Sequence, residues 1–297
     1  MRILHLSDIH VWQYNWNPLR LLSKRAVGMA SLVAGRARRF RLERLESVVE
    51  RAVGVAADHV LITGDLTTTA LASEFDEAAR RLAPLLEDPA RATVIPGNHD
   101  RYTPGSLRSR AFERRFGAFM PRSTFPWVRR LDDRTAILGL DATRPHLSAT
   151  GRLPAAQLER VRSWVDSTDP KPPRLVVASH YPILAPAVYR EELGRKRLVN
   201  ADQLRAILAP VGPHLYCCGH VHAAWAHRPR AWPDHLCLNA GAPLLRDKSG
   251  LRPPGFLEIE LHDATVSVIH HAWLGDDWAV VPLIQVPQFF VAATSKV

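Results

Sequence analysis

Five short polar clusters carry side chains typical of metal ligands, and each follows an apolar run that reads as a strand. The clusters are Asp8-Ile9-His10, Gly64-Asp65, Gly97-Asn98-His99-Asp100, His180 and Gly219-His220-Val221-His222. The candidate ligands among them are Asp8, His10, Asp65, Asn98, His180, His220 and His222. These seven oxygen or nitrogen donors are enough for two metal ions that share one carboxylate. Two ions a few ångströms apart can hold both the attacking and the leaving oxygen of a phosphoryl displacement.

The types of ligand narrow the choice of metal. Imidazole, carboxylate and amide oxygen without thiolate favour Mn, with Fe, Zn, Co and Ni as alternatives, over an all-oxygen Mg or Ca site. Within Asp8-x-His10 and His220-x-His222 the two side chains can point to one side, because positions i and i+2 of an extended chain share a face. Glycine, which allows a tight turn or a close backbone approach, precedes ligands at Gly64, Gly97 and Gly219.

Alternating apolar and helical stretches must position these clusters. Strands are predicted at 3–6, 60–63, 93–95, 135–140, 175–179 and 215–218, and helices at 42–55, 70–86, 107–116, 154–165 and 202–208. This alternation predicts an α/β domain with strands buried on both faces. Further strands at 236–239, 255–261 and 265–270 are expected to be antiparallel and to close a second sheet. We expect a single domain over 1–297, in which the apolar segment 273–297 has no assigned role.

The five clusters, taken in order, resemble the pattern D-x-H, G-D, G-N-H-D/E, H and G-H-x-H of the calcineurin-like metallophosphoesterase family. The resemblance covers roughly residues 1–240. It implies a four-layer α/β/β/α sandwich of two mixed sheets flanked by helices. It also implies that Asp8, His10, Asp65 and His222 bind one ion, and that Asp65, Asn98, His180 and His220 bind the other. His99 would point to the substrate as a catalytic group, and Asp100 would orient it or its loop.

The expected activity is hydrolysis of a phosphodiester or pyrophosphate bond. Two bound ions would lower the pKa of water and neutralise phosphate charge, while His99 would hydrogen-bond or protonate the leaving oxygen. Many phosphodiesterases of the family carry an acid where this chain has Thr68, so no role that needs a carboxylate is expected there. An inactive scaffold that keeps the fold is the alternative from another class.

A basic insertion follows the first cluster. The formal net charge is +10, and residues 18–44 hold eight Lys or Arg against one Glu. Between residues 12 and 41 we predict an amphipathic helix that starts at Asn17-Pro18 and is preceded by Trp12, Tyr14 and Trp16. It could be a cap with a solvated basic face, a contact with an anionic membrane or lipid substrate, or, least favoured, a nucleic-acid contact. The basic candidates for substrate or membrane contact are Arg20, Lys24, Arg25, Arg36, Arg38, Arg39, Arg195 and Arg197. Arg190 and Lys196, in the same loop after His180, could add to a positive rim over the site. Neutralising the arginines of residues 36–41 is expected to reduce vesicle binding and to leave hydrolysis of a small diester nearly unchanged.

The segment 17–25 and the Arg cluster after it also resemble a narrower branch, the peripheral-membrane UDP-2,3-diacylglucosamine pyrophosphatases of the lipid A pathway. Cyclic-nucleotide phosphodiesterases of the 3′,5′-cAMP type are the rival assignment. Three cysteines form no disulfide framework, and the first strand leaves no room for a signal peptide. No run of eighteen apolar residues is present. We therefore expect a cytoplasmic protein, peripheral on the inner face of the membrane.

Overall fold

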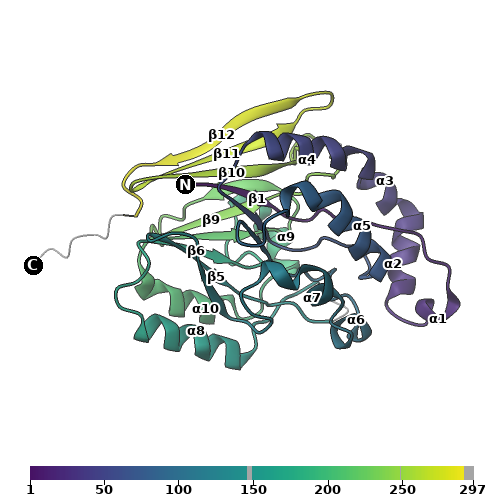
Figure 1. Ribbon diagram of the computed structural model, residues 1–297, viewed down its shortest axis with the longest axis horizontal. Coiled ribbons are helices and arrows are strands. Elements are labelled where there is room, and N and C mark those ends of the chain that lie inside the picture. The colour runs from purple at the N-terminus through teal and green to yellow at the C-terminus, as the bar shows by residue number, and fades with distance from the viewer. Residues whose placement is uncertain (146–148, 248, 291–297) are drawn as a thin grey trace, which may run out of the picture.

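Two six-stranded mixed sheets stack face to face, and helices cover their outer faces (Figure 1). The computed structural model describes residues 1–145, 149–247 and 249–290. The predicted α/β architecture, a four-layer sandwich of two mixed sheets flanked by helices, is confirmed.

The first sheet carries three parallel strands followed by antiparallel ones. Its order is β12-β11-β10-β1-β2-β3. The strands are β1 (Arg2–Leu6), β2 (His59–Ile62), β3 (Ala92–Val94), β10 (Gly255–His262), β11 (Thr265–Trp273) and β12 (Trp278–Val286). Strands β1, β2 and β3 run parallel, with Leu6 opposite Ile62 and Ile62 opposite Val94. Their carboxyl ends therefore meet at one edge.

The second sheet has the order β4-β5-β6-β7-β9-β8. Its strands are β4 (Trp127–Arg130), β5 (Thr135–Gly139), β6 (Arg174–Ala178), β7 (His214–Cys218), β8 (Ala224–His227) and β9 (His235–Ala240). The four central strands are parallel, and β4 and β8 are antiparallel edge strands. Side chains alternate across the sheet, as a period of two residues requires. Val176 belongs to the core between the sheets, whereas its neighbour Val177 belongs to the core shared with the outer helices.

Helices occupy both outer layers and one projecting end. They are α1 (Pro18–Leu21), α2 (Arg25–Ser31), α3 (Ala37–Arg39), α4 (Leu45–Gly54), α5 (Ala72–Leu82), α6 (Pro104–Arg108), α7 (Ala111–Phe116), α8 (Ala155–Ser167), α9 (Arg190–Arg195) and α10 (Ala201–Leu208). Figure 1 shows α4 and α5 beside one sheet and α8 and α10 beside the other, with α1 and α2 at the right-hand end. No described helix is both long and apolar enough to cross a membrane.

Several expected elements differ in detail. Strands β10 and β11 are antiparallel as predicted, but they extend the first sheet beside β1 instead of closing the second. The helix predicted at 107–116 is two helices, α6 and α7, because Arg110 takes a left-handed conformation with φ of 51°. Edge strands β4, β8 and β12 were not predicted. Strand β12 lies within the unassigned segment 273–297, of which residues 291–297 fall outside the described part.

The insertion at 12–41 is not one helix. Asn17 caps α1 as predicted, since its side chain accepts a hydrogen bond from the Leu19 amide. The chain then bends between α1 and α2, and a π-helical stretch (Leu32–Arg36) separates α2 from α3. Within that stretch Gly35 has φ of 125°, a value that favours glycine. This bend turns the following residues toward the carboxyl ends of the first sheet.

Candidate metal centre and active site

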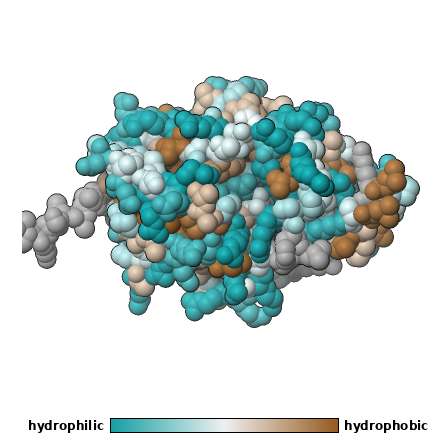
Figure 2. Space-filling view, turned by 90° about the horizontal axis from the view of Figure 1, so that it is seen from below, coloured by the Kyte–Doolittle hydropathy of each residue, from teal (hydrophilic) through white to brown (hydrophobic). Residues whose placement is uncertain are grey.

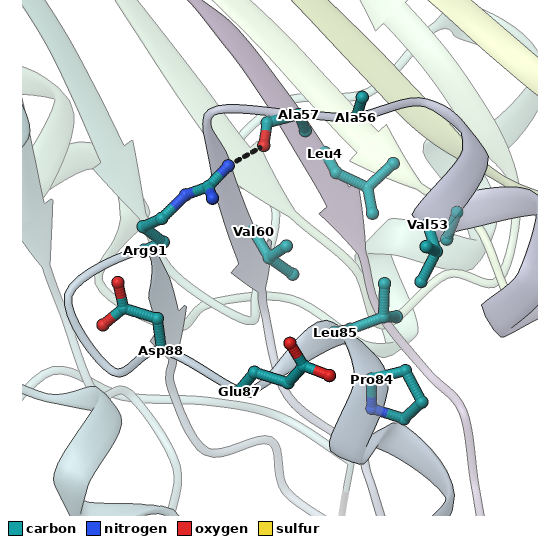
Figure 3. A pocket seen from close by; sticks show the side chains of 11 residues that line it. Leu4, Val53, Ala56, Ala57, Val60, Pro84, Leu85, Glu87, Asp88 and Arg91 are labelled. Atoms are coloured by element: carbon teal, nitrogen blue, oxygen red, sulfur yellow. Dashed lines mark hydrogen bonds between the residues drawn. The ribbon is translucent and has the colours of Figure 1, made fainter.

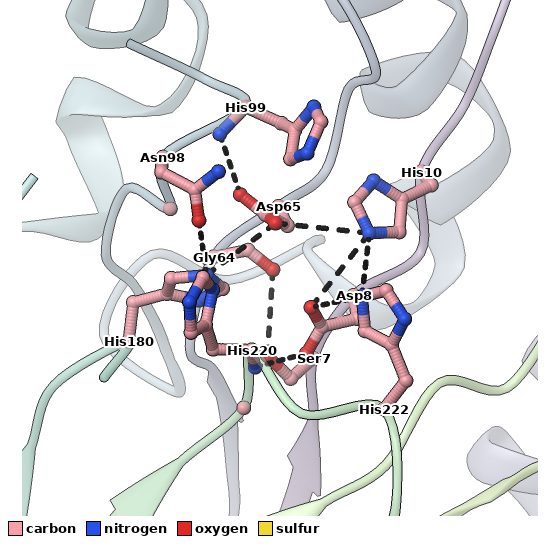
Figure 4. A network of polar contacts seen from close by, with 12 residues as sticks. Ser7, Asp8, His10, Gly64, Asp65, Asn98, His99, His180, His220 and His222 are labelled. Atoms are coloured by element: carbon pink, nitrogen blue, oxygen red, sulfur yellow. Dashed lines mark hydrogen bonds and ion pairs between the residues drawn. The ribbon is translucent and has the colours of Figure 1, made fainter. Parts of the chain in front are cut away.

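Loops at the carboxyl ends of five parallel strands bring the seven predicted ligands together. The loop after β1 carries Asp8 and His10, the loop after β2 carries Asp65, and the loop after β3 carries Asn98. The second sheet supplies His180 after β6, and His220 and His222 after β7. Figure 4 shows these side chains converging from both sheets. Their carboxylate and imidazole groups are at most slightly exposed.

The convergent side chains form two groups that share Asp65. In the first group, His222 Nε2 lies 3.2 Å from Asp8 Oδ1 and 3.1 Å from His10 Nε2. The Asp65 Oδ2 atom lies 3.7 Å from His10 Nε2. The same oxygen lies 3.4 Å from His180 Nε2, which belongs to the second group.

The second group is completed by Asn98 and His220. His180 Nε2 lies 3.1 Å from Asn98 Oδ1 and 3.2 Å from His220 Nδ1. His180 Nδ1 lies 2.7 Å from the Thr63 carbonyl oxygen, to which it donates. This bond directs Nε2 at its neighbours, the orientation in which a histidine ligates a metal. Although burial opposes it, the charge of Asp65 raises the pKa of His180 to about 9, so metal binding at Nε2 would displace a proton.

These residues fit a pair of divalent cations. The Nε2 atoms of His10 and His222 face each other at 3.1 Å, and His180 Nε2 faces His220 Nδ1 at 3.2 Å. Two ring nitrogens this close need either a shared proton or a cation between them. The buried atom Asp8 Oδ1 also has no hydrogen-bond partner among the described residues. Buried polar groups without a partner are costly, and coordinated cations between the side chains would satisfy the facing donor atoms.

Backbone strain is concentrated at the same residues. Five of them adopt left-handed conformations, with φ of 54° at Asp8, 54° at His10, 55° at Asp65, 73° at His220 and 61° at His222. Such conformations cost about 1–3 kcal/mol each and persist at sites where the surroundings enforce them. The His10 amide, for example, donates to the Asp65 carbonyl over 2.9 Å, which ties the two loops together.

Close backbone approaches explain two of the predicted glycines. A Cβ atom on Gly97 would lie 2.2 Å from the Asp65 amide nitrogen. A Cβ atom on Gly219 would lie 1.9 Å from Ser7 Oγ and 2.3 Å from Asp8 Oδ2. Only glycine fits at either position without moving a loop that carries candidate ligands.

His99 faces the metal groups through one ring nitrogen. Its Nδ1 donates to the Thr68 carbonyl oxygen over 2.6 Å, and its backbone amide donates to Asp65 Oδ1 over 2.7 Å. Burial and then the charge of Arg36 lower the pKa of His99 to about 3, so the ring is neutral with its proton on Nδ1. Its Nε2 accepts a hydrogen bond from Arg36 Nη2 over 3.3 Å. Ligand atoms of His10, Asp65 and His99 lie within 4.8 Å of one another, so distance alone does not separate His99 from the ligands.

Asp100 holds loops and does not touch the His99 ring. Its carboxylate accepts hydrogen bonds from the amides of Gly97 at 2.9 Å, Thr67 at 3.0 Å and Leu66 at 3.3 Å. Burial, followed by the charge of Asp65, raises the pKa of Asp100 to about 6. The geometry therefore makes Asp100 a residue that positions the loops through their backbone amides.

Thr68, at the position where many phosphodiesterases carry an acid, has a structural role. Its hydroxyl donates to the His10 carbonyl oxygen over 3.2 Å, and its own carbonyl accepts from His99. Thr68 thus links two of the predicted clusters through its hydroxyl and its backbone.

The basic residues proposed for substrate or membrane contact lie in different parts of the structure. Arg36 reaches the metal groups, and Arg25 donates to the carbonyl oxygens of Thr69 and Ala70. Lys24 lies 4.2 Å from the centre of the Tyr102 ring. The exposed members are Arg38, Arg39, Arg195, which pairs with Glu191, and Arg197. The Arg20 side chain lies outside the described part.

Sequence reasoning missed Arg252 and gave Lys196 only a place on a possible basic rim. Both line a cavity beside His222, and both bind Glu192. Arg252 lies 30 residues beyond His222 in a turn rich in proline and glycine. Nothing in its sequence context signals a place near the metal groups.

A separate cavity lies at the opposite ends of the strands (Figure 3). It has a volume of about 220 Å³ and is lined by residues such as Leu4, Val60 and Leu85. Arg91 closes one side, where it donates to the Ala57 carbonyl oxygen over 2.8 Å. None of the candidate ligands lines this cavity, so it is not the reaction site.

Comparisons with known proteins agree with this geometry. Residues 1–224 match the family described as calcineurin-like phosphoesterase. A comparison with curated proteins finds no match. Among solved structures, the chain is similar to the purple acid phosphatase PPD1 from yellow lupin (Lupinus luteus) seeds, with 13% identity and a TM-score of 0.66. That likeness covers 98% of this chain and 55% of the lupin chain, so the chain spans about half the length of that protein.

Two further structural neighbours are more distant. The phosphoesterase YfcE from E. coli shares 14% identity over 96% of this chain and 100% of its own, with a TM-score of 0.41. A putative 5′-nucleotidase from Staphylococcus aureus shares 13% identity over 95% of this chain and 54% of its own, with a TM-score of 0.46. At such identities structural likeness concerns the fold alone, and the family assignment rests on the sequence match. The chain therefore belongs to the calcineurin-like phosphoesterase family, a family of metal-dependent phosphoesterases that use a dinuclear metal centre.

Proposed function

We propose that this protein hydrolyses a phosphodiester or pyrophosphate bond at two divalent metal ions, with Mn as the first choice of metal. The observation that carries the proposal is the position of Asp65 Oδ2, 3.7 Å from His10 Nε2 and 3.4 Å from His180 Nε2. One carboxylate oxygen between two imidazole-containing groups is the arrangement that a bridging ligand needs. Asp8 and His222 would complete the first site, and Asn98 and His220 the second.

The two ions would supply a nucleophile from water near neutral pH and neutralise charge on the phosphoryl oxygens. The chain itself orients the reacting group. His99 Nε2 points into the space beside His10 and Asp65, where it can share a proton with a phosphoryl or leaving oxygen. The bond from Nδ1 to the Thr68 carbonyl keeps the ring in this orientation.

A membrane-associated nucleotide lipid, of the UDP-2,3-diacylglucosamine type, is the specific substrate that we propose. Support comes from apolar side chains at the projecting end, which Figure 2 shows in brown at the right, where α1 and α2 lie in Figure 1. Trp16 is 67% exposed, Leu19 79% and Leu22 84%. Water-exposed apolar side chains of this size, next to basic ones, are typical of helices that lie in a membrane interface.

An apolar groove of about 460 Å³ lies on the same insertion. Residues of α1, α2 and the following π-helical turn line it, among them Leu21, Met29 and Val33. The exposed guanidinium groups of Arg38 and Arg39 follow in α3. The basic and apolar surfaces therefore lie on one short segment, which favours an anionic membrane surface over a purely aqueous substrate.

The test compares UDP-2,3-diacylglucosamine and cyclic AMP as substrates, each with and without anionic liposomes, at a fixed Mn concentration. We expect hydrolysis of the nucleotide lipid to increase with liposomes, and cyclic AMP to be a poor substrate. Hydrolysis of cyclic AMP alone, without liposome binding, would assign the chain to the rival cyclic-nucleotide phosphodiesterases. A generic diester, bis(p-nitrophenyl) phosphate, tests the chemistry independently, and no turnover with Mn, Fe, Zn, Co or Ni would return the chain to the scaffold alternative.

A further inference from the structure

A second cavity adjoins the metal groups on the side of the insertion. Its volume is about 490 Å³, and His222, one of the candidate ligands, lines it. The insertion contributes Arg36 and Arg39, and the chain after β6 contributes Lys196 from the opposite side. His222 and Arg36 both line this cavity and contact the metal groups, so the cavity borders the first metal group.

The cavity is strongly cationic. Four basic side chains line it, namely Arg36, Arg39, Lys196 and Arg252, against the single carboxylate of Glu192. Lys196 Nζ lies 2.7 Å from Glu192 Oε1, and Arg252 Nη2 bonds the other oxygen of the same carboxylate. Although burial opposes ionisation, these two hydrogen bonds lower the pKa of Glu192 to about 2. Glu192 is thus ionised and fixes the two cations that flank it.

The two arginines from the insertion have no such carboxylate. Within the described residues, neither Arg36 nor Arg39 forms an ion pair. Arg36 Nη2 lies 3.3 Å from His10 Nδ1 and 3.3 Å from His99 Nε2, so the guanidinium stands at the junction of cavity and metal groups. Its buried Nε has no hydrogen-bond partner in the described part of the chain. Arginine donors left without a partner beside a phosphoryl site are suited to a second anion, because the guanidinium fork matches phosphate oxygens.

We infer that the cavity lined by Arg36, Arg39, Lys196 and Arg252 is a second anion subsite, which holds the phosphate adjacent to the one that reacts at the metal groups. The inference rests on the proposed function and deepens it, since it specifies a diphosphate diester as the substrate class. Adjacent phosphates share one bridging oxygen, so their subsites must be neighbours, and this cavity borders the metal groups at His222 and Arg36.

The reaction at such a substrate has a defined balance. Water adds its oxygen to the phosphorus at the metal groups and releases its protons, one of which the bridging oxygen or solvent accepts. The bond from that phosphorus to the bridging oxygen breaks with its electron pair on that oxygen, and the products are two monophosphate esters. The bridging oxygen leaves with the second phosphate, whose negative charge increases as the bond breaks. Cations around that phosphate stabilise the transition state more than the bound substrate, and such differential binding accelerates the reaction.

Arg39 and Arg38 offer a matched pair of variants. Both are exposed arginines in α3, and both Arg39→Gln and Arg38→Gln remove one positive charge. Only Arg39 lines the cavity beside His222, whereas Arg38 faces other parts of the surface. Any difference between the variants therefore reports on the cavity and not on net charge.

The experiment measures binding of UDP and UMP to the Mn-loaded protein by calorimetry at a fixed concentration of free Mn. We expect the wild type to bind UDP about tenfold more tightly than UMP, Arg39→Gln to lose most of this preference, and Arg38→Gln to keep it. Equal binding of UDP and UMP by the wild type would overturn the inference. So would equal losses of UDP affinity in the two variants. Turnover of bis(p-nitrophenyl) phosphate, measured on the same wild-type sample, tests the proposed hydrolytic function separately, because that compound carries one phosphate.

Discussion

At the scale of single residues, His99 decides whether hydrolysis depends on a group that does not bind metal. The hydrogen bond from its Nδ1 to Thr68 directs Nε2 at the reaction site. We expect His99→Ala to retain two metal ions per chain and to lower turnover of a phosphodiester about a hundredfold or more, the contribution of a positioned acid–base group. Elemental analysis and turnover are measured on the same sample. Loss of one ion would instead make His99 a ligand together with His10 and Asp65, which lie near enough.

Asp100 gives a second prediction, which concerns stability as well as metal. In Asp100→Asn, the amide can no longer accept all the backbone hydrogen bonds that the carboxylate takes from Leu66, Thr67 and Gly97. We expect the free energy of unfolding to fall by about 3 kcal/mol and metal content to decrease, because buried amides lose their acceptor. Denaturant unfolding measures the first and elemental analysis the second.

The control is Asp76→Asn, which removes a carboxylate from an exposed pair with Arg115. Such pairs contribute about 1 kcal/mol or less. If Asp100→Asn changed stability as little as this control does, the loop-holding role of Asp100 would be wrong.

The convergence of the candidate ligands could be predicted from sequence because each follows a short apolar strand and parallel strands end at a common edge. The contacts of Arg36 with His10 and His99 could not be predicted in this way. Its position in the sequence suggested one basic surface with Arg38 and Arg39, but the left-handed bend at Gly35 turns Arg36 inward. The conformation of Gly35 therefore changes the proposed role of Arg36. Helical periodicity in the sequence contains no information about that conformation.

At the scale of elements, the insertion presents two different faces. One carries Arg36 to the metal groups, and the other exposes apolar side chains at α1. The sequence predicted the cap at Asn17 and the amphipathic composition, since both are local properties. It also led us to expect that neutralising residues 36–41 would leave hydrolysis nearly unchanged. The contacts of Arg36 with His10 and His99 remove that expectation for Arg36 itself.

The apolar face gives a prediction on membrane binding. Leu19 and Leu22 are 79% and 84% exposed, so replacing both with Asp leaves the core intact. We expect the double variant to bind anionic vesicles at least about tenfold more weakly, because each buried leucine contributes about 2 kcal/mol and two charges oppose insertion. Sedimentation with phosphatidylglycerol vesicles measures the bound fraction.

Leu274→Asp is the matched control, since Leu274 is 65% exposed at the turn between β11 and β12, far along the chain from the insertion. It should bind vesicles as the wild type does. Equal binding by the double variant, this control and the wild type would exclude α1 as the membrane contact.

At the scale of the whole molecule, a sheet of the sandwich can contain strands that lie far apart in the sequence. Alternation of strands and helices predicted the α/β class. It did not reveal that β10 pairs with β1 at the opposite end of the sequence, since an antiparallel strand can extend either sheet. The pairing of Leu257 with His5, for example, depends on tertiary packing in the core between the sheets.

That core and its borders also bury neutral histidines away from the metal groups, which makes stability depend on pH. Burial lowers the pKa of His59 to about 3, of His214 to about 4 and of His270 to about 4, against an ordinary value of 6.5. Below pH 6.5 the unfolded chain binds protons at these rings and the folded chain does not. The free energy of unfolding should therefore fall as the pH decreases from about 6.5 to about 4, by at most about 1.4 kcal/mol per pH unit for each ring.

His59→Gln isolates one of these contributions. His59 Nε2 bonds Thr93 Oγ1 over 2.8 Å, and a glutamine amide can also hydrogen-bond that hydroxyl without titrating. Between pH 7.5 and pH 5, we expect the variant to lose about 2 kcal/mol less stability than the wild type, measured by denaturant unfolding at both values. His262→Gln, which makes the same replacement at a ring 70% exposed, is the control. If His59→Gln had the same pH dependence as that control, His59 would not be a source of the acid sensitivity, because the carboxylates common to all three proteins cancel in the comparison.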